Sequence, residues 1–299
     1  MKQKTLSKLF TISGRGLHTN NECTVICCPA DVNHGVVFER TDIEPHPKIK
    51  AISENTSSFN RNTTIKNQYA EVATIEHFMS LFYILGIDNM LIKVSNMELP
   101  ILDGSAMPIL AAMQQQDCSV IEQNAEKEYI TIKKHITFDD GTSKIEAYPY
   151  DGLKIQVEVD FPHPIGKQQV IFDDKTNINM LASSRTFVML SDILYLYQNN
   201  LIKGGSLDNA IVIANVALPE DTVRQLSTIF GIKDEISISE EGILNNTRLR
   251  DEHEIGYHKL LDFIGDISLS GKPIRGFIKA YKPGHYANHK FVEELIATM

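Results

Sequence analysis

The sequence predicts an α+β fold in which one structural plan occurs twice. Helical and β-like runs are mixed along the chain without strict strand–helix alternation, which favours sheets layered against helices. HFMSLFYILGIDNMLIKV, at 77–94, begins with a histidine on a helical run, reaches a glycine and continues into a β-like run. HKLLDFIGDISLSGKPIRGFIKA, at 258–280, does the same. We therefore expect two similar halves, each with a sheet layer and a helix layer.

The first half supplies three strands, a helix, a fourth strand and a second helix. β-branched content and flanking turn residues predict strands in LFTISG, CTVICCP and GVVFER. A helix at about 72–85, the strand NMLIKV and a helix at about 106–114 follow. The polar stretch QQQDCSVIEQNAEKE indicates a linker, so we place a boundary near 124, between domains at 1–124 and 125–299.

The second half repeats the plan and adds one segment. Strands are predicted in YITIKKHITF, SKIEAYP, LKIQVEVDF and PIRGFIKAY, and a last helix from about His285. Residues 183–213 do not fit the repeat, because they combine a helix rich in Leu, Ile and Tyr with a Gly-Gly turn and a β run. This βαβ-like hydrophobic insertion could be plain packing, or it could form the wall of an apolar pocket.

Composition and charge exclude several classes of protein. The 299 residues are 42% hydrophobic and carry a net charge of −9, which argues against a general nucleic-acid binder. No signal-peptide core and no apolar run long enough to cross a bilayer occurs, so we expect a cytoplasmic protein without stable membrane insertion. The four cysteines, Cys23, Cys27, Cys28 and Cys118, lack a second pair to complete a zinc site and are expected to be buried, reduced thiols.

The helix GYHKLLDFIGD, at 256–266, carries His258, Asp262 and Asp266 at four-residue spacing. Residues so spaced lie one above another, so all three fall on a single stripe. For an arbitrary helix such a stripe is most simply a solvated face. A second pair of residues favours a functional stripe over a solvated face. Glu76 and His77 are adjacent at the start of an otherwise apolar helix, and a carboxylate beside a metal site can act as a general base.

One interpretation joins these residues across the two halves. His77, His258 and Asp262 would make a His-His-carboxylate set with an open fourth position, as in catalytic zinc sites. No HExxH motif occurs, so the ligands would have to meet in space. His285, at the start of the last helix, could be paired with Asp266 and stay protonated as an acid, or it could simply face solvent.

Three further motifs are less specific. GRGLHT, at 14–19, is a glycine-bracketed turn that presents His18. LPILDGSAMP contains an Asp-Gly-Ser turn that would cap the following helix. KGGSLDNA, at 203–210, could hold a phosphate through its Gly-Gly-Ser turn, although such turns are common.

GRGLHT, TIEH, LGIDN, LPILDGSA, SRTF, GGSLDNA, HKLLDFIGD and PGHYAN occur in this order along the chain. The set resembles the motifs of the UDP-3-O-acyl-N-acetylglucosamine deacetylases, which are zinc amidases of lipid A biosynthesis in Gram-negative bacteria. The resemblance covers nearly the whole chain. It implies a β-α-α-β sandwich of two similar domains, with the helix layers facing each other and the active site at the domain junction.

The resemblance also implies a metal and a base. His77, His258 and Asp262 would bind Zn²⁺, and Fe²⁺ suits the same ligands. Glu76 would deprotonate the attacking water. The reaction would release acetate from the small-molecule substrate UDP-3-O-acyl-N-acetylglucosamine, and we expect a monomer.

The remaining roles follow from the same resemblance. His285, held by Asp266, would protonate the leaving amine, and Thr186 in SRTF would stabilise the oxyanion. Lys259 would contact the sugar–diphosphate region and Phe187 would stack on the sugar. The insertion, including Ile193, would hold the 3-O-acyl chain. Gly205, Ser206 and His18, in the two turn motifs, complete the predicted substrate contacts.

Arg15 and Asn20 depart from the family pattern on either side of GLHT, which leaves the geometry of the His18 loop open. A related metal amidase with another acylated or nucleotide substrate is the first alternative; the insertion and Lys259 argue against it. A catalytically inactive binding homologue is the second; the presence of both Glu76 and His285 argues against it.

Overall fold

The computed structural model describes residues 1–58, 61–199, 203–214, 223–227, 236–244 and 247–298, and it has a mixed α+β fold with several sheets. Residues 200–202 of the predicted insertion lie outside the described residues. No helix among the described residues is long and apolar enough to span a membrane.

The first sheet has the strand order β2-β3-β9-β4-β5. Its strands are β2 (Phe10–Arg15), β3 (Glu22–Pro29), β9 (Met90–Val94), β4 (Val36–Arg40) and β5 (Lys48–Lys50). All neighbours are antiparallel except β4 and β9, which are parallel. Helix α1 (Glu76–Ile84) precedes β9 in the chain and α2 (Met107–Gln115) follows it.

The second sheet has the strand order β12-β13-β18-β14-β15, with β11 (Ile130–Thr131) also pairing with β18. Its strands are β12 (Ile136–Asp139), β13 (Lys144–Tyr148), β18 (Ile274–Tyr281), β14 (Leu153–Asp160) and β15 (Lys167–Phe172). The four neighbouring pairs along this order are antiparallel except for β14 and β18, which are parallel. Helix α6 (Glu254–Ile267), which continues into the 3-10 turn η2 (Ser268–Ser270), precedes β18, and α7 (His285–Ala297) follows it.

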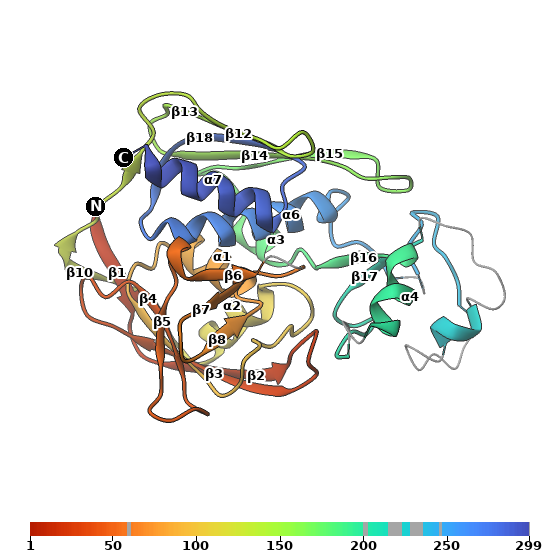
Figure 1. Ribbon diagram of the computed structural model, residues 1–299, viewed down its shortest axis with the longest axis horizontal. Coiled ribbons are helices and arrows are strands. Elements are labelled where there is room, and N and C mark those ends of the chain that lie inside the picture. Colours follow the sequence, from red (N-terminus) through yellow and green to blue (C-terminus); the bar gives the residue numbers. More distant parts are fainter. Residues whose placement is uncertain (59–60, 200–202, 215–222, 228–235, 245–246, 299) are drawn as a thin grey trace.

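The two sheets therefore share one pairing pattern, with a parallel pair at the same place in each order. Figure 1 shows the sheets along opposite edges of the molecule with the four helices between them. Helix α1 packs on α6, and α6 and α7 pack on the second sheet. A single apolar cluster runs through these layers; Phe38, Phe78, Phe263 and Phe291 are among its fully buried members.

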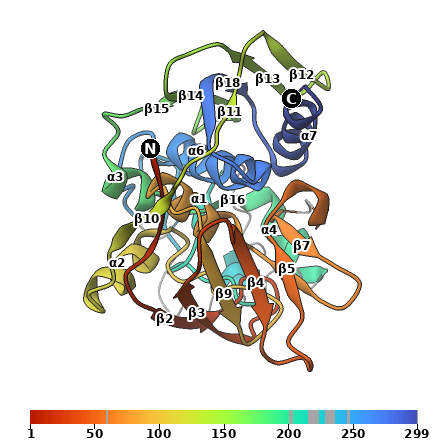
Figure 2. The same cartoon turned by 90° about the vertical axis from the view of Figure 1, so that its left-hand side faces the viewer.

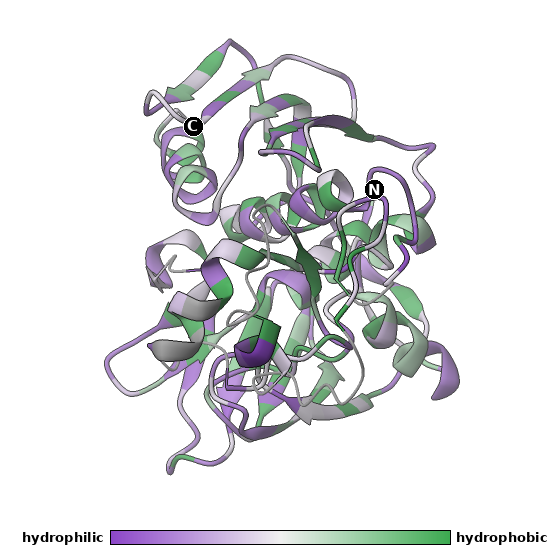
Figure 3. Cartoon of the chain, turned by 90° about the vertical axis from the view of Figure 1, so that its right-hand side faces the viewer, coloured by the Kyte–Doolittle hydropathy of each residue, from purple (hydrophilic) through white to green (hydrophobic). Residues whose placement is uncertain are grey.

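Three smaller units complete the described fold. Strand β1 (Lys2–Leu6) pairs with β10 (Val120–Glu126), as Figure 2 shows beside the N-terminus. Strands β6 (Thr56–Ser58), β7 (Thr64–Lys66) and β8 (Glu71–Ala73) form a small sheet. A short helix, α3 (Ile178–Ala182), leads to the parallel pair β16 (Phe187–Met189) and β17 (Ile211–Ile213), which α4 (Leu190–Gln198) connects. Strand β17 consists entirely of Ile and Val, residues at the hydrophobic, green end of the scale in Figure 3.

Three local predictions were wrong. The polar stretch interpreted as a linker contains β10, which pairs with β1 although four of its seven residues are exposed. The first helix begins at Glu76 rather than near 72, because 71–73 pair with β7 as a strand. YITIKKHITF forms two short strands rather than one, and they pair with different partners. The four cysteines are free, and three of them are buried.

Candidate active site

The start of α1 presents Glu76 and His77 next to α6. Thr74, two residues earlier, has φ +60°, a left-handed conformation that β-branched residues rarely adopt. Such a conformation costs on the order of 1–3 kcal/mol and persists only where its surroundings enforce it. Asn62 Nδ2 donates to Thr74 Oγ1 at 3.0 Å, inside the protein. This turn sends the chain directly from β8 into α1.

The polar stripe of α6 faces α1 instead of solvent. His258, Asp262 and Asp266 are each at most 4% exposed, so the solvated-face interpretation does not apply. Gly265, on the same helix, permits the close approach: a Cβ there would lie 2.3 Å from the Glu76 carbonyl oxygen. The two helices therefore cross at the residues that carry the predicted chemistry.

His77, His258 and Asp262 come together as a buried group that could hold a metal ion, with their ligand atoms all within 4.8 Å of one another. Asp262 Oδ1 lies 3.4 Å from His258 Nε2 and 3.7 Å from His77 Nε2. His258 Nδ1 lies 3.1 Å from the Ser184 carbonyl oxygen. Because a carbonyl only accepts, Nδ1 carries the proton and Nε2 keeps its lone pair for a metal.

Electrostatics favour, in each of these three candidate ligands, the protonation state that can bind a metal. Burial, with the neighbouring His258, lowers the pKa of His77 to about 3. Burial also lowers the pKa of His258. Burial alone would raise the pKa of Asp262, but His258 and Lys259 hold it well below its ordinary value. Neutral imidazoles and an ionised carboxylate are the states that bind metal.

Glu76 and His285 lie on either side of a shared polar network. Glu76 Oε2 accepts from the backbone N–H of Thr63 at 3.0 Å. His285 Nδ1 donates to Asp266 Oδ2 at 2.8 Å, and Asn288 Nδ2 donates to the same oxygen. The Thr63 hydroxyl donates to Asp266 Oδ1 at 2.5 Å and lies 3.1 Å from His285 Nδ1.

The same network separates the proton affinities of the two groups. Burial raises the pKa of Glu76 to about 7, against the opposing charge of His285. Burial alone would lower the pKa of His285, but the charge and hydrogen bond of Asp266, with Glu76 beyond it, raise it to about 9. A carboxylate that titrates near neutral pH and a histidine that stays protonated suit a base and an acid, respectively.

A cavity of about 90 Å³ holds most of the predicted substrate contacts. Its lining includes His18, Thr186, Phe187, Ile193, Leu196, Gly205 and Ser206. The ring of Phe187 lies edge-on to that of His258, with centroids 6.2 Å apart, which connects this cavity to the metal-ligand group. Lys259 is the exception: its Nζ donates to Asp262 Oδ2 at 2.7 Å and it does not line the cavity.

Glycines bring the less specific sequence motifs together around the cavity. A Cβ on Gly204 would lie 2.1 Å from the Gly16 carbonyl oxygen, so KGGS packs directly on GRGLHT. A Cβ on Gly104, which has φ +84°, would lie 2.2 Å from the Asn209 carbonyl oxygen. Gly104 also accepts from the backbone N–H of Thr186 at 2.7 Å. The Asp-Gly-Ser turn thus positions Thr186 as well as leading into α2.

Comparison with known proteins assigns the chain to a family. The model of the LpxC family, UDP-3-O-acyl N-acetylglycosamine deacetylase, matches residues 3–228 and 226–297. The chain belongs to this family.

Two kinds of relative share its sequence. The UDP-3-O-acyl-N-acetylglucosamine deacetylase of Pseudomonas entomophila is 35% identical over 302 residues, covering 99% of this chain and 91% of that protein. The enzyme of the same name from Syntrophotalea carbinolica is 38% identical, with 99% and 88% covered. The bifunctional enzyme LpxC/FabZ of Porphyromonas gingivalis is 39% identical over 97% of this chain. The chain spans 63% of that relative, a little under two thirds of its length.

In this LpxC chain, a buried ion-pair network that sequence analysis did not single out supports the metal-ligand group. Glu254, fully buried, accepts from Arg185 Nε at 2.8 Å and from the Arg250 backbone N–H at 2.6 Å. Arg250 in turn donates to the Ser183 carbonyl and to Asp103. The network therefore fixes residues 183–185, whose Ser184 carbonyl orients His258. Glu254 was detectable, because it precedes His258 by four residues and extends the stripe by one turn.

Sequence analysis also missed Thr63 and Arg61. Thr63 lies between Glu76 and the Asp266–His285 pair, yet it is 203 residues from Asp266 in the chain and carries no motif. Arg61 lines the 90 Å³ cavity and forms an ion pair with Asp192 of α4 at 3.4 Å. His289, one turn after His285, is buried against Glu293 and not at the surface.

The two departures from the LpxC pattern have local explanations. Asn20 has φ +59°, the left-handed conformation that a glycine would adopt and that asparagine tolerates. Arg15 donates to Glu22 at 2.8 Å and to the Asn20 carbonyl at 3.0 Å, which closes the turn. The backbone N–H groups of His18 and Thr19 donate to the Glu98 carboxylate, and these two hydrogen bonds fix the position of the loop.

Proposed function

We propose that the chain hydrolyses the N-acetyl group of UDP-3-O-acyl-N-acetylglucosamine and releases acetate, as a metal-dependent deacetylase of lipid A biosynthesis. One observation carries the proposal: a buried group of two histidines and one aspartate lies beside a carboxylate with a pKa of about 7 and a histidine with a pKa of about 9. Three protein ligands are the number found in catalytic zinc sites, whose fourth position is taken by water or substrate. Membership of the LpxC family supports the substrate class.

The donor set fits zinc. A tetrahedral site with bonds of about 2.1 Å separates its ligand atoms by about 3.4 Å. The distances from Asp262 Oδ1 to the two histidine nitrogens are 3.4 and 3.7 Å. Zinc held there by His77, His258 and Asp262 would supply a Lewis acid toward the acetamide carbonyl and the attacking water. Fe²⁺ would suit the same ligands.

The protein groups would divide the proton transfers. Glu76, oriented by the Thr63 amide, would accept a proton from the water that attacks the acetamide carbon. His285 donates through Nδ1 to Asp266, which leaves its Nε2–H free to protonate the departing amine. The Thr186 hydroxyl has no hydrogen bond within the described residues, and it would donate one to the oxyanion.

The cavity beside Phe187 would receive the substrate. Ile193 and Leu196 would contact the 3-O-acyl chain, while His18, Gly205 and Ser206 would contact its polar part. At about 90 Å³ the cavity is smaller than typical ligand pockets of roughly 300–1,000 Å³. A long acyl chain would therefore need a shift of α4 or an exit from the cavity. Lys259 would reach the diphosphate region only by exchanging its bond to Asp262.

We also propose that the chain forms two domains of one plan in a β-α-α-β sandwich, divided near 124, which lies within strand β10 and not in a linker. The shared pairing pattern of the two sheets supports this arrangement. The site would then lie where α1 and α6 meet. The cytoplasmic location and the monomeric state stay predictions from the sequence.

Mass spectrometry of the reaction products tests the proposal. The zinc-loaded chain should convert UDP-3-O-acyl-N-acetylglucosamine into the free amine and acetate. UDP-N-acetylglucosamine without the acyl chain should react much more slowly, since it cannot use the cavity beside Phe187. Equal rates on both, or loss of the acyl group instead of the acetyl group, would contradict the proposed reaction.

A further inference from the structure

A second, larger cavity lies apart from the candidate active site. Its volume is about 310 Å³, and it shares no lining residue with the predicted metal, catalytic or substrate-contact residues. Its wall comes from both halves of the chain: the last part of α1, the ends of β4 and β5, the segment around 127–129, and η2 with the start of β18. For comparison, an apolar cavity of about 150 Å³ binds benzene.

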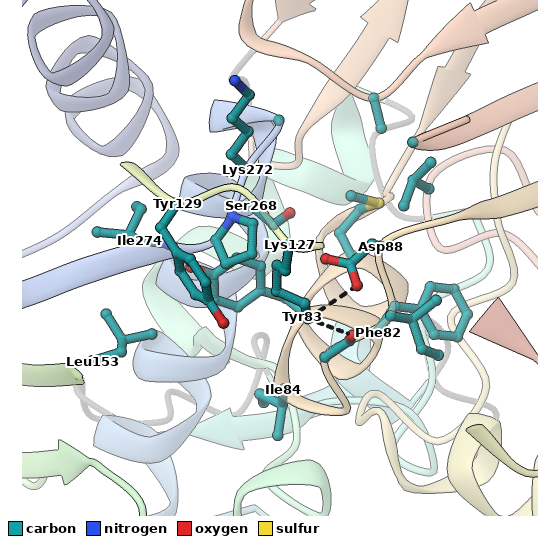
Figure 4. A pocket seen from close by; sticks show the side chains of 18 of the residues that line it. Phe82, Tyr83, Ile84, Asp88, Lys127, Tyr129, Leu153, Ser268, Lys272 and Ile274 are labelled. Carbon is teal, nitrogen blue, oxygen red and sulfur yellow. Dashed lines mark hydrogen bonds and ion pairs between the residues drawn. The ribbon is translucent and has the colours of Figure 1, made fainter. Parts of the chain in front are cut away.

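The body of the cavity is apolar. Met79, Phe82, Ile84, Ile87, Leu153 and Ile274 contribute to its lining. Figure 4 shows Ile84, Leu153 and Ile274 entering from three different elements around the opening. Such a wall favours a hydrocarbon group, because burial of apolar surface is the main favourable term available to a ligand there.

The charges on the lining are unusual for this protein. Among the described residues that line the cavity, four side chains are cationic, Lys50, Lys127, Lys272 and Arg275, and Asp88 is the single acid. The whole chain carries a net charge of −9. The cavity therefore lies in a locally positive region of an acidic protein, which favours an anionic ligand.

Two of the four cations already have partners. Lys127 lies beside Asp88 in Figure 4, with Nζ 3.0 Å from the carboxylate. The same Nζ donates to the Gly86 carbonyl oxygen. Lys272 Nζ lies 2.6 Å from Glu128. The charges of these two lysines are already neutralised by the neighbouring carboxylates.

Arg275 differs from them. Its guanidinium lies over the Tyr129 ring, 3.9 Å from the centroid, and it has no hydrogen bond or ion pair within the described residues. Stacking fixes the plane of a guanidinium and leaves its edge free for a bidentate oxyanion.

A hydroxyl donor, that of Tyr83, lines the same cavity as Arg275. Tyr83 Oη accepts from the backbone N–H of Ile274, the residue before Arg275, at 2.9 Å. No described residue accepts the proton of that hydroxyl. An anionic headgroup could therefore receive hydrogen bonds from both side chains.

We propose that this cavity binds an amphipathic anion: a hydrocarbon chain of modest length among the apolar residues, with a carboxylate or phosphate headgroup on Arg275 and the Tyr83 hydroxyl. This proposal does not depend on the proposed deacetylase activity. Its ligand would lie at the far end of α1 from Glu76 and His77.

Isothermal titration calorimetry of the full chain with decanoate, decyl phosphate and decanol tests the headgroup. One or both anions should bind saturably, and decanol at least about tenfold more weakly. The difference between decanoate and decyl phosphate would show which headgroup is preferred. Binding of decanol as tight as that of both anions, or no saturable binding of any probe, would overturn the proposal.

Two matched variants test the site. Arg275→Met keeps the apolar stem and should weaken anion binding at least about tenfold. Lys272→Met, whose charge is already paired with Glu128, should change it little. Circular dichroism would verify the fold of each variant. Equal effects of the two substitutions would overturn the role of Arg275.

A crystal structure with a bromine-labelled decanoate locates the ligand without a variant. An anomalous peak between Ile84 and Leu153 would support the proposal. A peak found only in the cavity lined by Phe187 and Ile193 would place the anion in the proposed acyl passage instead and overturn it.

Discussion

At the scale of single residues, the proposed activity depends on which groups hold and release protons. Asp266 accepts from His285, Asn288 and Thr63, so its carboxylate is the centre of the network around the proposed acid. The pKa of His285 is raised above its ordinary value, so the acid form is fully present below the ordinary pKa. That form is lost as pH rises through about 9.

Asp266→Asn should move the alkaline limb of the pH–kcat profile to lower pH. The amide removes the charge that raises the pKa of His285, so less of the acid is protonated at pH 8, and activity there should fall more than at pH 6. The profile of zinc-loaded protein between pH 5 and 10 checks this, with zinc content measured in the same samples. An alkaline limb at the same pH in both proteins would remove His285 from the acid role.

Glu254→Gln should destabilise the protein and weaken metal binding together. The substitution leaves Arg185, only 12% exposed, without its counter-charge, which costs on the order of 3–5 kcal/mol. Loss of the contact that fixes residues 183–185 should also lower zinc affinity about tenfold through His258. Urea unfolding and competition with a zinc-binding dye measure the two effects.

Glu252→Gln is the matched control for that substitution. Glu252 lies two residues earlier and its side chain is 86% exposed, so the free energy of unfolding and the zinc affinity should stay unchanged. Wild-type zinc affinity in Glu254→Gln would show that the network supports the fold alone.

Residue types and spacing predicted much of the candidate site but not its supporting groups. Glu76, His77, His258 and Asp262 could be proposed because helical periodicity and adjacency mark them locally. Thr63 could not, because its contacts to Glu76 and Asp266 arise only when distant segments meet. Lys259 shows the same limit, since the sequence does not reveal that its Nζ lies on Asp262.

At the scale of elements, the crossing of α1 and α6 sets the distance between the proposed base and the proposed metal ligands. Gly265→Ala should separate these helices, because the new Cβ would meet the Glu76 backbone carbonyl, which cannot rotate away. We expect a loss of about 1–3 kcal/mol in the free energy of unfolding, despite the better helix propensity of alanine, and a drop in kcat.

Gly256→Ala, on the same helix, provides the comparison. Its Cβ would meet the side chains of Gln168 and Val170 at 3.1 and 3.2 Å, and these can adjust by a few tenths of an ångström. Urea unfolding should show a smaller loss for this variant. A Gly265→Ala protein as stable and active as Gly256→Ala would contradict the close-crossing argument.

Helix α4 provides Ile193 and Leu196, the residues proposed to contact the acyl chain. Leu196→Gln places a polar group in the cavity beside Phe187, and a fully buried leucine contributes about 1.5–3 kcal/mol. kcat/KM for a long-acyl substrate should therefore fall roughly tenfold or more, and that for a short-acyl substrate much less. Equal losses for both substrates would count against the acyl passage.

Element type was easier to predict than element boundaries. Alternation and β-branched content located most strands of both sheets. The start of α1 was predicted four residues too early, because the apolar Val72 and Ala73 belong to strand β8 instead. Pairing of β10 with β1 depends on a partner more than a hundred residues away, so a polar stretch could not reveal it.

At the scale of the whole molecule, the repeat visible in the sequence corresponds to a repeat in strand pairing. In each sheet the strand that follows the helix of the candidate site is central and has a parallel neighbour at the same place in the strand order, β4 beside β9 and β14 beside β18. Strand β11 adds a second parallel pairing to β18. The helices α1 and α6 occupy equivalent places before those strands and pack on each other. The same order of helical histidine, glycine and β-like run at 77–94 and 258–280 was sufficient to predict two similar halves. It did not reveal how one half packs on the other.

The central claim is that this chain is a deacetylase whose metal lies on His77, His258 and Asp262. The most direct test is acetate release from UDP-3-O-acyl-N-acetylglucosamine by protein stripped of metal and then given one equivalent of zinc, for wild type and Asp262→Ala in parallel. We predict restored activity in the wild type, with low zinc content and no acetate release in the variant. Full zinc occupancy and activity in Asp262→Ala, or a folded, zinc-loaded wild type that releases no acetate, would contradict the account.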